Sequence, residues 1–400
     1  MGEEKEKVGL VLVDDSSTLL VKKILFEAVE KKASDVLIEP FSNHLQVRHK
    51  IDGVFYIAHS FPLNFHLKIV NCLKVIANLD IAEHRLPQEG RFKLKKLTTQ
   101  DVDIRISIIP SVLGEKIALR VLDKSRVKLD LNKLGFDDYS RELLKRNLKR
   151  SFGIILVCGR AGSGKTTTLY SALRFVDTIE KNIITVEDPI EYELYGINQV
   201  AVNEKMGLTF SRIVRSILRQ DPDIILVGEM RDYDTVEIAL RASLTGHLVL
   251  STLHATRSSA ALLRLKDMGA PPFLISSSVL LVCTQELVRL LCPFCKQAYS
   301  PSPQIWELFK AEGIEVNEKL PLYREKGCQQ CLNTGFKGRK AVMEALEVTP
   351  LIRTNINYNI SQQEIEKLAL QQGMRSLKVN ALRDAMEGII PLEEVFRIQE

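Results

Sequence analysis

Residues 153–166 read GIILVCGRAGSGKT, an apolar run that leads into a glycine-rich turn. The turn matches the pattern G-x-x-x-x-G-K-[ST], in which backbone N–H groups converge on phosphates and the following helix presents its positive end to them. In such a turn Lys165 reaches the β- and γ-phosphates, and the Thr166 hydroxyl is a ligand of Mg²⁺. The sequence therefore predicts a site for a nucleoside triphosphate.

Strand and helix alternate through the residues that follow this loop. Each apolar run is followed by a stretch with apolar positions at helical spacing, a rhythm typical of a mostly parallel sheet covered by helices. The runs expected to be strands are 153–159, 182–189, 223–229 and 247–255. We predict an α/β domain over 135–291, with the phosphate loop at the carboxyl edge of its sheet.

The residues before the loop have a different pattern. The stretch TLLVKKILFEAVEKKA at 18–33 carries apolar positions at helical spacing, and short β-rich pieces follow it. This mixture is typical of a small α+β domain, which we place at 1–123. A linker is expected at 124–134.

Acidic residues end two of the predicted strands at the same edge. Glu229 follows the run DIILVG, and Glu187 and Asp188 follow NIITV. A carboxylate at a strand tip can orient an attacking water, or it is a solvated acid after a buried strand. His247 and His254 bracket the last strand, and each is either a hydrogen-bonded structural residue or a sensor of phosphate.

Four of the seven cysteines form two C-x-x-C pairs. Cys292 and Cys295 make the first pair, Cys328 and Cys331 the second. In a reducing compartment such pairs indicate a metal site, and four thiolates suit a closed, structural Zn²⁺ site; the alternative is four free thiols. The long gap between the pairs predicts a looped-out sub-domain over 292–340, and a helical region follows at 341–400.

Composition narrows the class of protein. The 55 Lys and Arg against 50 Asp and Glu leave a formal charge of +5, which is too small and dispersed to indicate nucleic acid. No apolar run reaches the roughly 18 residues of a membrane span, and the charged amino terminus lacks a signal-peptide core. We expect a cytoplasmic protein that reaches any membrane through a partner.

Four stretches occur in a fixed order: GRAGSGKTTTLY, TVEDPIEY, DPDIILVGEMRD and TGHLVLSTLHAT. In order and spacing they resemble the four boxes of the secretion ATPases, the motors of type II secretion and type IV pilus assembly. SDVLIEP, AEHRLPQEGRF and GMRSLKVNALRDAMEGIIPLEEVFRI look like further signatures of that family. The likeness runs from about residue 18 to 398, so we expect this chain to lack the front domain that many relatives carry. It implies a RecA-like ATPase core preceded by a PAS-like domain.

The resemblance also implies roles for single residues. Lys165 and Thr166 match the Walker A box, Glu187 the Asp box, Glu229 the Walker B box, and His247 and His254 the His box. Arg91 and Arg105 fall where the family keeps arginines that reach the phosphates; read alone, each is a surface cation. We expect Glu229 to orient the water and Glu187 to assist, with the two roles open to exchange. The residues expected to contact the nucleotide are Gly159, Arg160, Ala161, Gly162, Ser163, Gly164, Lys165, Thr166, Thr167 and His247.

From the resemblance we expect an ATP-hydrolysing motor that uses ATP, Mg²⁺ and structural Zn²⁺. It would act as a homo-hexamer on an inner-membrane platform protein, to assemble a pilus or secrete protein. The tetracysteine segment favours these over pilus retraction, because the retraction motors lack it. The alternative is a DNA-handling ATPase of a conjugation or uptake apparatus, where related cores occur and which the mildly basic charge allows. The one basic run, KRNLKR at 145–150, lacks interleaved aromatic residues and is typical of an exposed helix face. One departure from the family is Glu286, which stands where an arginine is customary.

Overall fold

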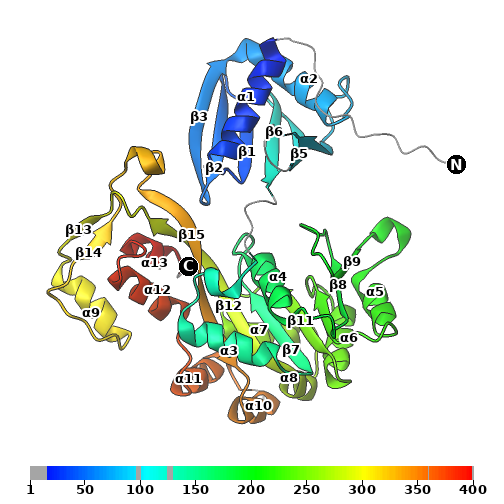
Figure 1. Cartoon of the computed structure of the whole chain (residues 1–400), viewed down its shortest axis with the longest axis vertical. Helices are drawn as coiled ribbons and strands as arrows, with labels where there is room; N and C mark the ends of the chain where they lie inside the picture. Colours follow the sequence, from blue (N-terminus) through cyan, green and yellow to red (C-terminus); the bar gives the residue numbers. More distant parts are fainter. Residues whose placement is uncertain (1–15, 96–100, 124–128, 359, 399–400) are drawn as a thin grey trace. The chain divides into compact units, whose positions relative to one another are not determined.

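The computed structural model of the protein describes residues 16–95, 101–123, 129–358 and 360–398. The chain divides into two compact units, 1–127 and 128–400 (Figure 1). The predicted linker spans this division, and its residues 124–128 lie outside the described part, as do residues 1–15 of the predicted amino-terminal domain.

The first unit is a six-stranded antiparallel sheet with two helices. The strands lie in the order β3-β2-β1-β6-β5-β4. The helices are α1 (Ser16–Glu30) and α2 (His66–Ile76), and α2 is an addition to the predicted pattern. The strands are β1 (Asp35–Pro40), β2 (His44–Ile51), β3 (Val54–Pro62), β4 (Gln88–Leu94), β5 (Val102–Ser111) and β6 (Gly114–Leu122).

The two faces of this sheet differ because successive side chains of a strand point to opposite sides. On one face, apolar residues such as Ile104 and Ile106 form a core with those of α1 and α2, including Leu25 and Leu73. On the other face, Arg91 of β4 lies directly opposite Arg105 of β5, and Arg105 lies opposite Arg120 of β6. The register therefore places three arginines in one row across neighbouring strands.

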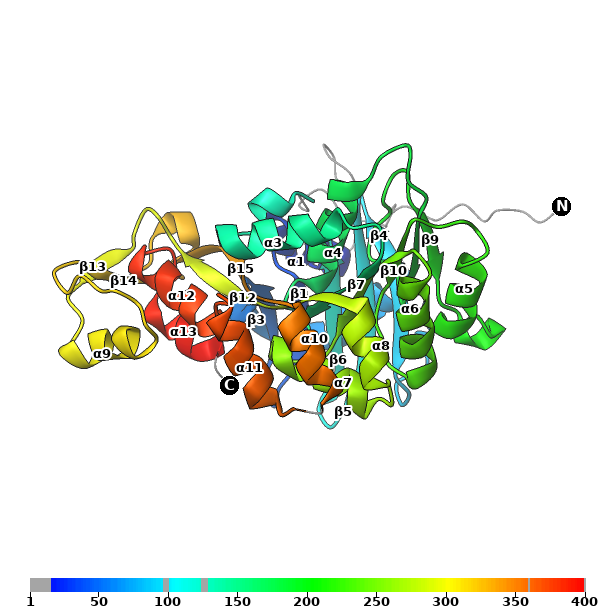
Figure 2. The same ribbon diagram turned by 90° about the horizontal axis from the view of Figure 1, so that it is seen from below.

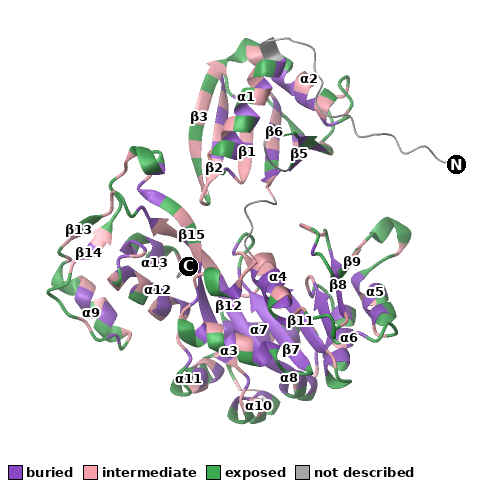
Figure 3. Ribbon diagram, in the orientation of Figure 1, coloured by how far each residue is buried: buried purple, intermediate pink, exposed green. Residues whose placement is uncertain are grey.

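The second unit is built around a seven-stranded sheet in the order β15-β12-β7-β11-β10-β8-β9. Every neighbouring pair is parallel except β12 and β15, which are antiparallel. The strands are β7 (Gly153–Cys158), β8 (Ile183–Glu187), β9 (Asn198–Ala201), β10 (Ile224–Val227), β11 (Leu248–Leu253), β12 (Val279–Leu291) and β15 (Phe336–Glu347). The central strands β7 and β11 are buried along their whole length (Figure 3).

Helices cover both faces of this sheet, as the α/β prediction requires (Figure 2). Ile155 and Val157 of β7 share a core with α3 (Asp138–Leu148) and α4 (Lys165–Val176), whereas Ile154 and Leu156 share one with helices of the other face. The helices of that face are α5 (Phe210–Ile217), α6 (Tyr233–Leu244), α7 (Ser258–Asp267), α8 (Pro272–Ser278), α10 (Pro350–Asn357) and α11 (Gln362–Gln371).

The tetracysteine segment and the last helices lie together beyond the β15 edge (Figures 1 and 2). Their elements are β13 (Gln297–Tyr299), α9 (Pro303–Ala311), β14 (Leu322–Arg324), α12 (Leu377–Met386) and α13 (Leu392–Ile398). The predicted helical region 341–400 contains α10 to α13, but its first residues belong to β15, which continues to Glu347 and pairs with β12. Within the described residues, no helix combines the length and the apolar character that crossing a membrane demands.

Candidate active site

The phosphate loop follows β7 at the carboxyl edge of the sheet, where it was predicted. Its backbone turns tightly at Gly159, whose φ is 143°. A Cβ atom at this position would lie 2.4 Å from the main-chain oxygen of Gln285 and 2.5 Å from Ser163 Oγ, so no side chain fits. Arg160 and Ala161 form the exposed tip of the loop, whereas Ser163 is buried.

Lys165 and Thr166 open helix α4 and line one cavity. Lys165 Nζ donates hydrogen bonds to the main-chain oxygens of Gly159 (2.8 Å) and Arg160 (2.9 Å), which holds the ammonium group over the loop. Burial lowers the pKa of Lys165, because the charged form loses its hydration. The Lys165 Nζ group thus lies against the loop, and the neighbouring Thr166 lines the same cavity.

The parallel strands bring the predicted acids to this cavity. β8, β10 and β11 run side by side in the same direction, so the residues at their carboxyl ends share one edge with the phosphate loop. The resulting cavity has a volume of about 170 Å³. Its lining includes Lys165, Thr166, Tyr170, Glu187, Asp188, Glu229, Thr252 and His254.

Glu187 is a buried carboxylate with hydrogen bonds to both oxygens. Thr185 Oγ1 donates to Oε1 over 2.6 Å and Gln199 Nε2 donates to the same oxygen over 3.0 Å. Tyr170 Oη donates to Oε2. Burial, together with this neighbouring carboxylate, raises the pKa of Tyr170 far above its usual range. Only 4% of Glu187 is exposed, so this carboxylate is held in place and has little access to water.

Glu229 is the more accessible acid, with 18% of its side chain exposed. It forms an ion pair with Arg231, whose Nη1 also lies 3.4 Å from Asp188 Oδ2. The hydrogen bond to Glu229 raises the pKa of Arg231. His254 Nε2 lies 3.7 Å from the Glu229 carboxylate. A carboxylate that faces the cavity from the strand edge can orient a water for attack.

Three predicted site residues lie elsewhere. His247 precedes β11, at the opposite end of that strand from His254, and its Nδ1 makes a hydrogen bond to the main-chain oxygen of Ala242 over 2.8 Å. A six-residue strand spans about 20 Å, so the structure does not bring His247 to the phosphate loop. Arg91 and Arg105 lie side by side in the first unit, where Arg91 Nη2 is 3.2 Å from Asp103 Oδ2.

Several residues of the site had escaped prediction. Arg231 could have been found, because it lies two residues after Glu229 and so near the same strand tip. Tyr170 and Gln199 reach Glu187 from α4 and β9, and Gln285 reaches the loop from β12. These three contacts join residues distant in sequence, and no local pattern marks them.

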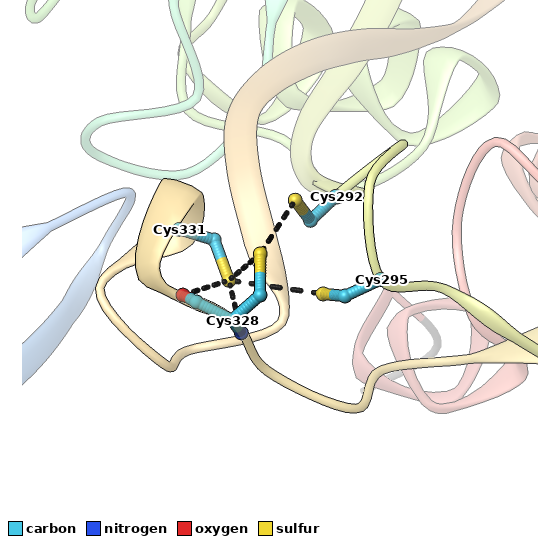
Figure 4. A group of neighbouring side chains, drawn as sticks. All are labelled: Cys292, Cys295, Cys328 and Cys331. Atoms are coloured by element: carbon cyan, nitrogen blue, oxygen red, sulfur yellow. Dashed lines mark hydrogen bonds between the residues drawn. The ribbon is translucent and has the colours of Figure 1, made fainter.

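The four paired cysteines converge on one point (Figure 4). Their sulfur atoms all lie within 4.8 Å of one another, and the Sγ–Sγ distances are 3.9 Å for Cys292–Cys328, 3.8 Å for Cys295–Cys331 and 3.7 Å for Cys328–Cys331. Four sulfurs at the usual Zn–S distance of a tetrahedral site lie about 3.8 Å apart. The cluster therefore has the donor set and size that Zn²⁺ requires.

Main-chain groups stabilise one of these sulfurs. The N–H groups of Cys328 and Gly335 each lie 3.2 Å from Cys331 Sγ. Burial opposes ionisation of this thiol, but the N–H donors outweigh burial and lower the pKa of Cys331. A lowered pKa favours the thiolate, which is the form that binds metal.

Comparison with known proteins identifies the family. A family model described as "Type II/IV secretion system protein" matches residues 13–397. The chain belongs to the type II/IV secretion system protein family. The type IV pilus assembly ATPase PilB of Myxococcus xanthus is 42% identical over 399 residues, which cover 98% of this chain and 70% of that protein. The type II secretion system ATPase E of Vibrio cholerae is 43% identical over 386 residues, 96% of this chain and 76% of that one.

Two solved structures share the fold. DotB of Legionella pneumophila aligns with a TM-score of 0.70 at 19% identity, over 100% of this chain and 98% of that chain. The pilus retraction motor PilT with bound ADP aligns with a TM-score of 0.60 at 24% identity, over 94% of this chain and 96% of that chain.

The family model and the curated relatives confirm the family that was inferred from the sequence motifs. This member of the type II/IV secretion system proteins is an ATPase.

Proposed function

We propose that the chain is a mechanochemical ATPase that works as a homo-hexamer on a membrane platform protein. Hydrolysis around such a ring would move the first unit against the second and drive pilus assembly or type II secretion. The observation that carries this proposal is one cavity lined both by Lys165 and Thr166, which follow the phosphate loop, and by the acidic strand tips at Glu187 and Glu229. Relatives named for pilus assembly and for type II secretion fit it equally.

The geometry supports a division of labour among the cavity residues. Lys165 would neutralise the β- and γ-phosphates, and Thr166 would hold Mg²⁺. Glu229 would orient the attacking water, because it follows β10 at the cavity and is more accessible than Glu187. Glu187 would have a positioning role. Its carboxylate accepts three hydrogen bonds, which would hold Tyr170 and the end of β8 beside the reacting phosphate. His254, close to Glu229, would respond to the charge on the phosphates.

The first unit would supply further cations. We propose that it is the PAS-like domain of the family, which its antiparallel sheet and helix-covered face support. Arg91 and Arg105 occupy adjacent register positions on the face opposite α1 and α2. From there the pair would reach a bound triphosphate, in the same subunit or the next, and stabilise the charge that develops in the transition state.

The tetracysteine cluster would hold a structural Zn²⁺. Four thiolates leave no open coordination position, so the metal would fix the fold of the segment around β13, β14 and α9 and take no part in hydrolysis. We also propose that the protein works at the inner face of the cytoplasmic membrane through its partner.

Phosphate release tests the enzymatic part of the proposal. The protein with MgATP should release inorganic phosphate. The Glu229→Gln variant should still bind ATP, but it should release phosphate at least about a hundredfold more slowly. The ATP-loaded Glu229→Gln chain should also recover a polytopic platform protein from membranes. Recovery of DNA instead, with DNA-stimulated and salt-sensitive hydrolysis, would favour the DNA-handling alternative. A wild-type protein that releases no phosphate alongside its membrane partner would overturn the proposal.

A further inference from the structure

Gln285 contacts the phosphate loop from behind, although it belongs to none of the four nucleotide motifs. It lies on β12, one residue beyond Thr284, which is paired with Cys158 at the end of β7. Its side chain is fully buried. Because β12 extends past the end of β7, Gln285 lies against the inner side of the loop that continues from β7.

The Gln285 carboxamide makes two hydrogen bonds that join the loop to the helix. Nε2 donates to the main-chain oxygen of Ser163 over 2.8 Å, and Oε1 accepts from Thr168 Oγ1 over 2.8 Å. Ser163 precedes Gly164, the last residue of the loop, and Thr168 lies in the first turns of α4. One side chain therefore fixes the distance and orientation between the loop and the helix that present N–H groups to phosphate.

The bond to Ser163 determines where a loop N–H group points. The carbonyl of Ser163 and the N–H of Gly164 belong to one planar trans peptide, so they point in opposite directions. A donor that holds the carbonyl toward the protein interior aims the Gly164 N–H outward, toward the phosphate position. Gly164 has φ of 90°, and a glycine in this region offers little resistance to rotation of the peptide. The side chain of Gln285 supplies the restraint that the glycine backbone lacks.

We propose that Gln285 is a positioning residue of the nucleotide site, which holds the phosphate loop in its binding conformation through Ser163. This inference rests on the proposed binding of a nucleoside triphosphate at the loop. Gln285 touches the back of the loop and not the phosphates, so its contribution is preorganisation: without the donor, the buried carbonyl of Ser163 is unpaired and the peptide rotates to find a partner.

The test compares two buried carboxamides in the full chain. Gln285→Leu removes the donor to Ser163. Asn380→Leu is the matched control, because Asn380 is also buried and its Nδ2 donates to the main-chain oxygen of Met343 over 2.7 Å, a bond that leaves the loop untouched. Titration with a fluorescent ADP analogue and Mg²⁺ gives Kd, and phosphate release gives KM and kcat.

A positioning role predicts a selective loss of affinity. Gln285→Leu should raise Kd and KM about tenfold, while kcat at saturating ATP stays within about threefold of wild type. Asn380→Leu should leave Kd unchanged, even though it removes a similar bond and lowers thermal stability. Thr168→Val, which keeps the donor to Ser163, should raise Kd by less than Gln285→Leu.

Further outcomes decide the inference. If Gln285→Leu does not fold, Gln285→Met keeps the length and volume of the side chain without a hydrogen-bond donor, and it should still weaken nucleotide binding. A folded Gln285 variant that binds nucleotide as tightly as wild type would overturn the inference, as would an equal loss in Asn380→Leu. A wild-type chain that binds no nucleotide would instead overturn the proposed function, and the inference with it.

Discussion

Two carboxylates of the cavity, Glu187 and Glu229, should respond in opposite ways to loss of charge. Glu187 accepts hydrogen bonds at both oxygens, from Thr185 and Gln199 at one and from Tyr170 at the other. In Glu187→Gln, the oxygen that meets Tyr170 becomes an NH₂ group, from which the Tyr170 hydroxyl can accept a hydrogen bond. The bonds to a carboxylate are charge-assisted and their replacements are neutral, so in a site that is 4% exposed the loss totals about 2–3 kcal/mol. For a unit of this size that cost lowers Tm by about 4–12 °C.

Glu229→Gln should show the reverse pattern. Glu229 is partly exposed, and its partner Arg231 is more than half exposed, so loss of their ion pair changes stability by less than about 1 kcal/mol. If this carboxylate orients the water, turnover at saturating ATP falls by about 10²- to 10⁴-fold while nucleotide binding remains. Stability and turnover thus separate the roles that the sequence left open to exchange.

Thermal unfolding and phosphate release, measured on the same preparations, test this reasoning. Tyr170→Phe serves as the control, because it removes one donor to Glu187 and leaves both acids in place; it should lower Tm with a smaller change in kcat. The reasoning is refuted if Glu187→Gln keeps the wild-type Tm but loses turnover a hundredfold while Glu229→Gln stays active. In that case Glu187 orients the water.

Three other perturbations follow from the geometry. Cys328→Ser should reduce the zinc content measured by elemental analysis and lower Tm, and a protein with well under one zinc per chain before substitution contradicts the metal site. Because burial lowers the pKa of Lys165, this lysine loses its charge at a lower pH than an ordinary lysine, so nucleotide affinity should fall as pH rises from 7 toward about 10; an affinity that is flat over this range contradicts the role. Lys74 is fully buried with Nζ 2.8 Å from Glu115 Oε1, so Lys74→Met should destabilise the first unit by about 3–5 kcal/mol in denaturant titration, whereas exposed Lys93→Met should change it little.

Local sequence determined the parts of this protein that depend on residues close together in the chain. The phosphate loop needs glycines and a lysine at fixed spacing between a strand and a helix, and the stretch at 153–166 contains all of them. Alternating strands and helices imply a parallel sheet, and such a sheet brings Glu187, Glu229 and His254 to the loop because strand ends share an edge. The four nucleotide motifs identified the family because each is a short local stretch and their order is set by the chain.

Tertiary structure alone decided which side chains surround those motifs. His247 and His254 belong to one motif, yet they lie at opposite ends of β11. The residues between them form an extended strand, which holds the two histidines apart. The edge strand β15, taken for part of a helical region, exists because β12 offers it a pairing partner. Gln285 reaches the loop only after β12 has packed beside β7, far from the loop in sequence. Contacts of this kind depend on strand order and register, and no local pattern of residues encodes them.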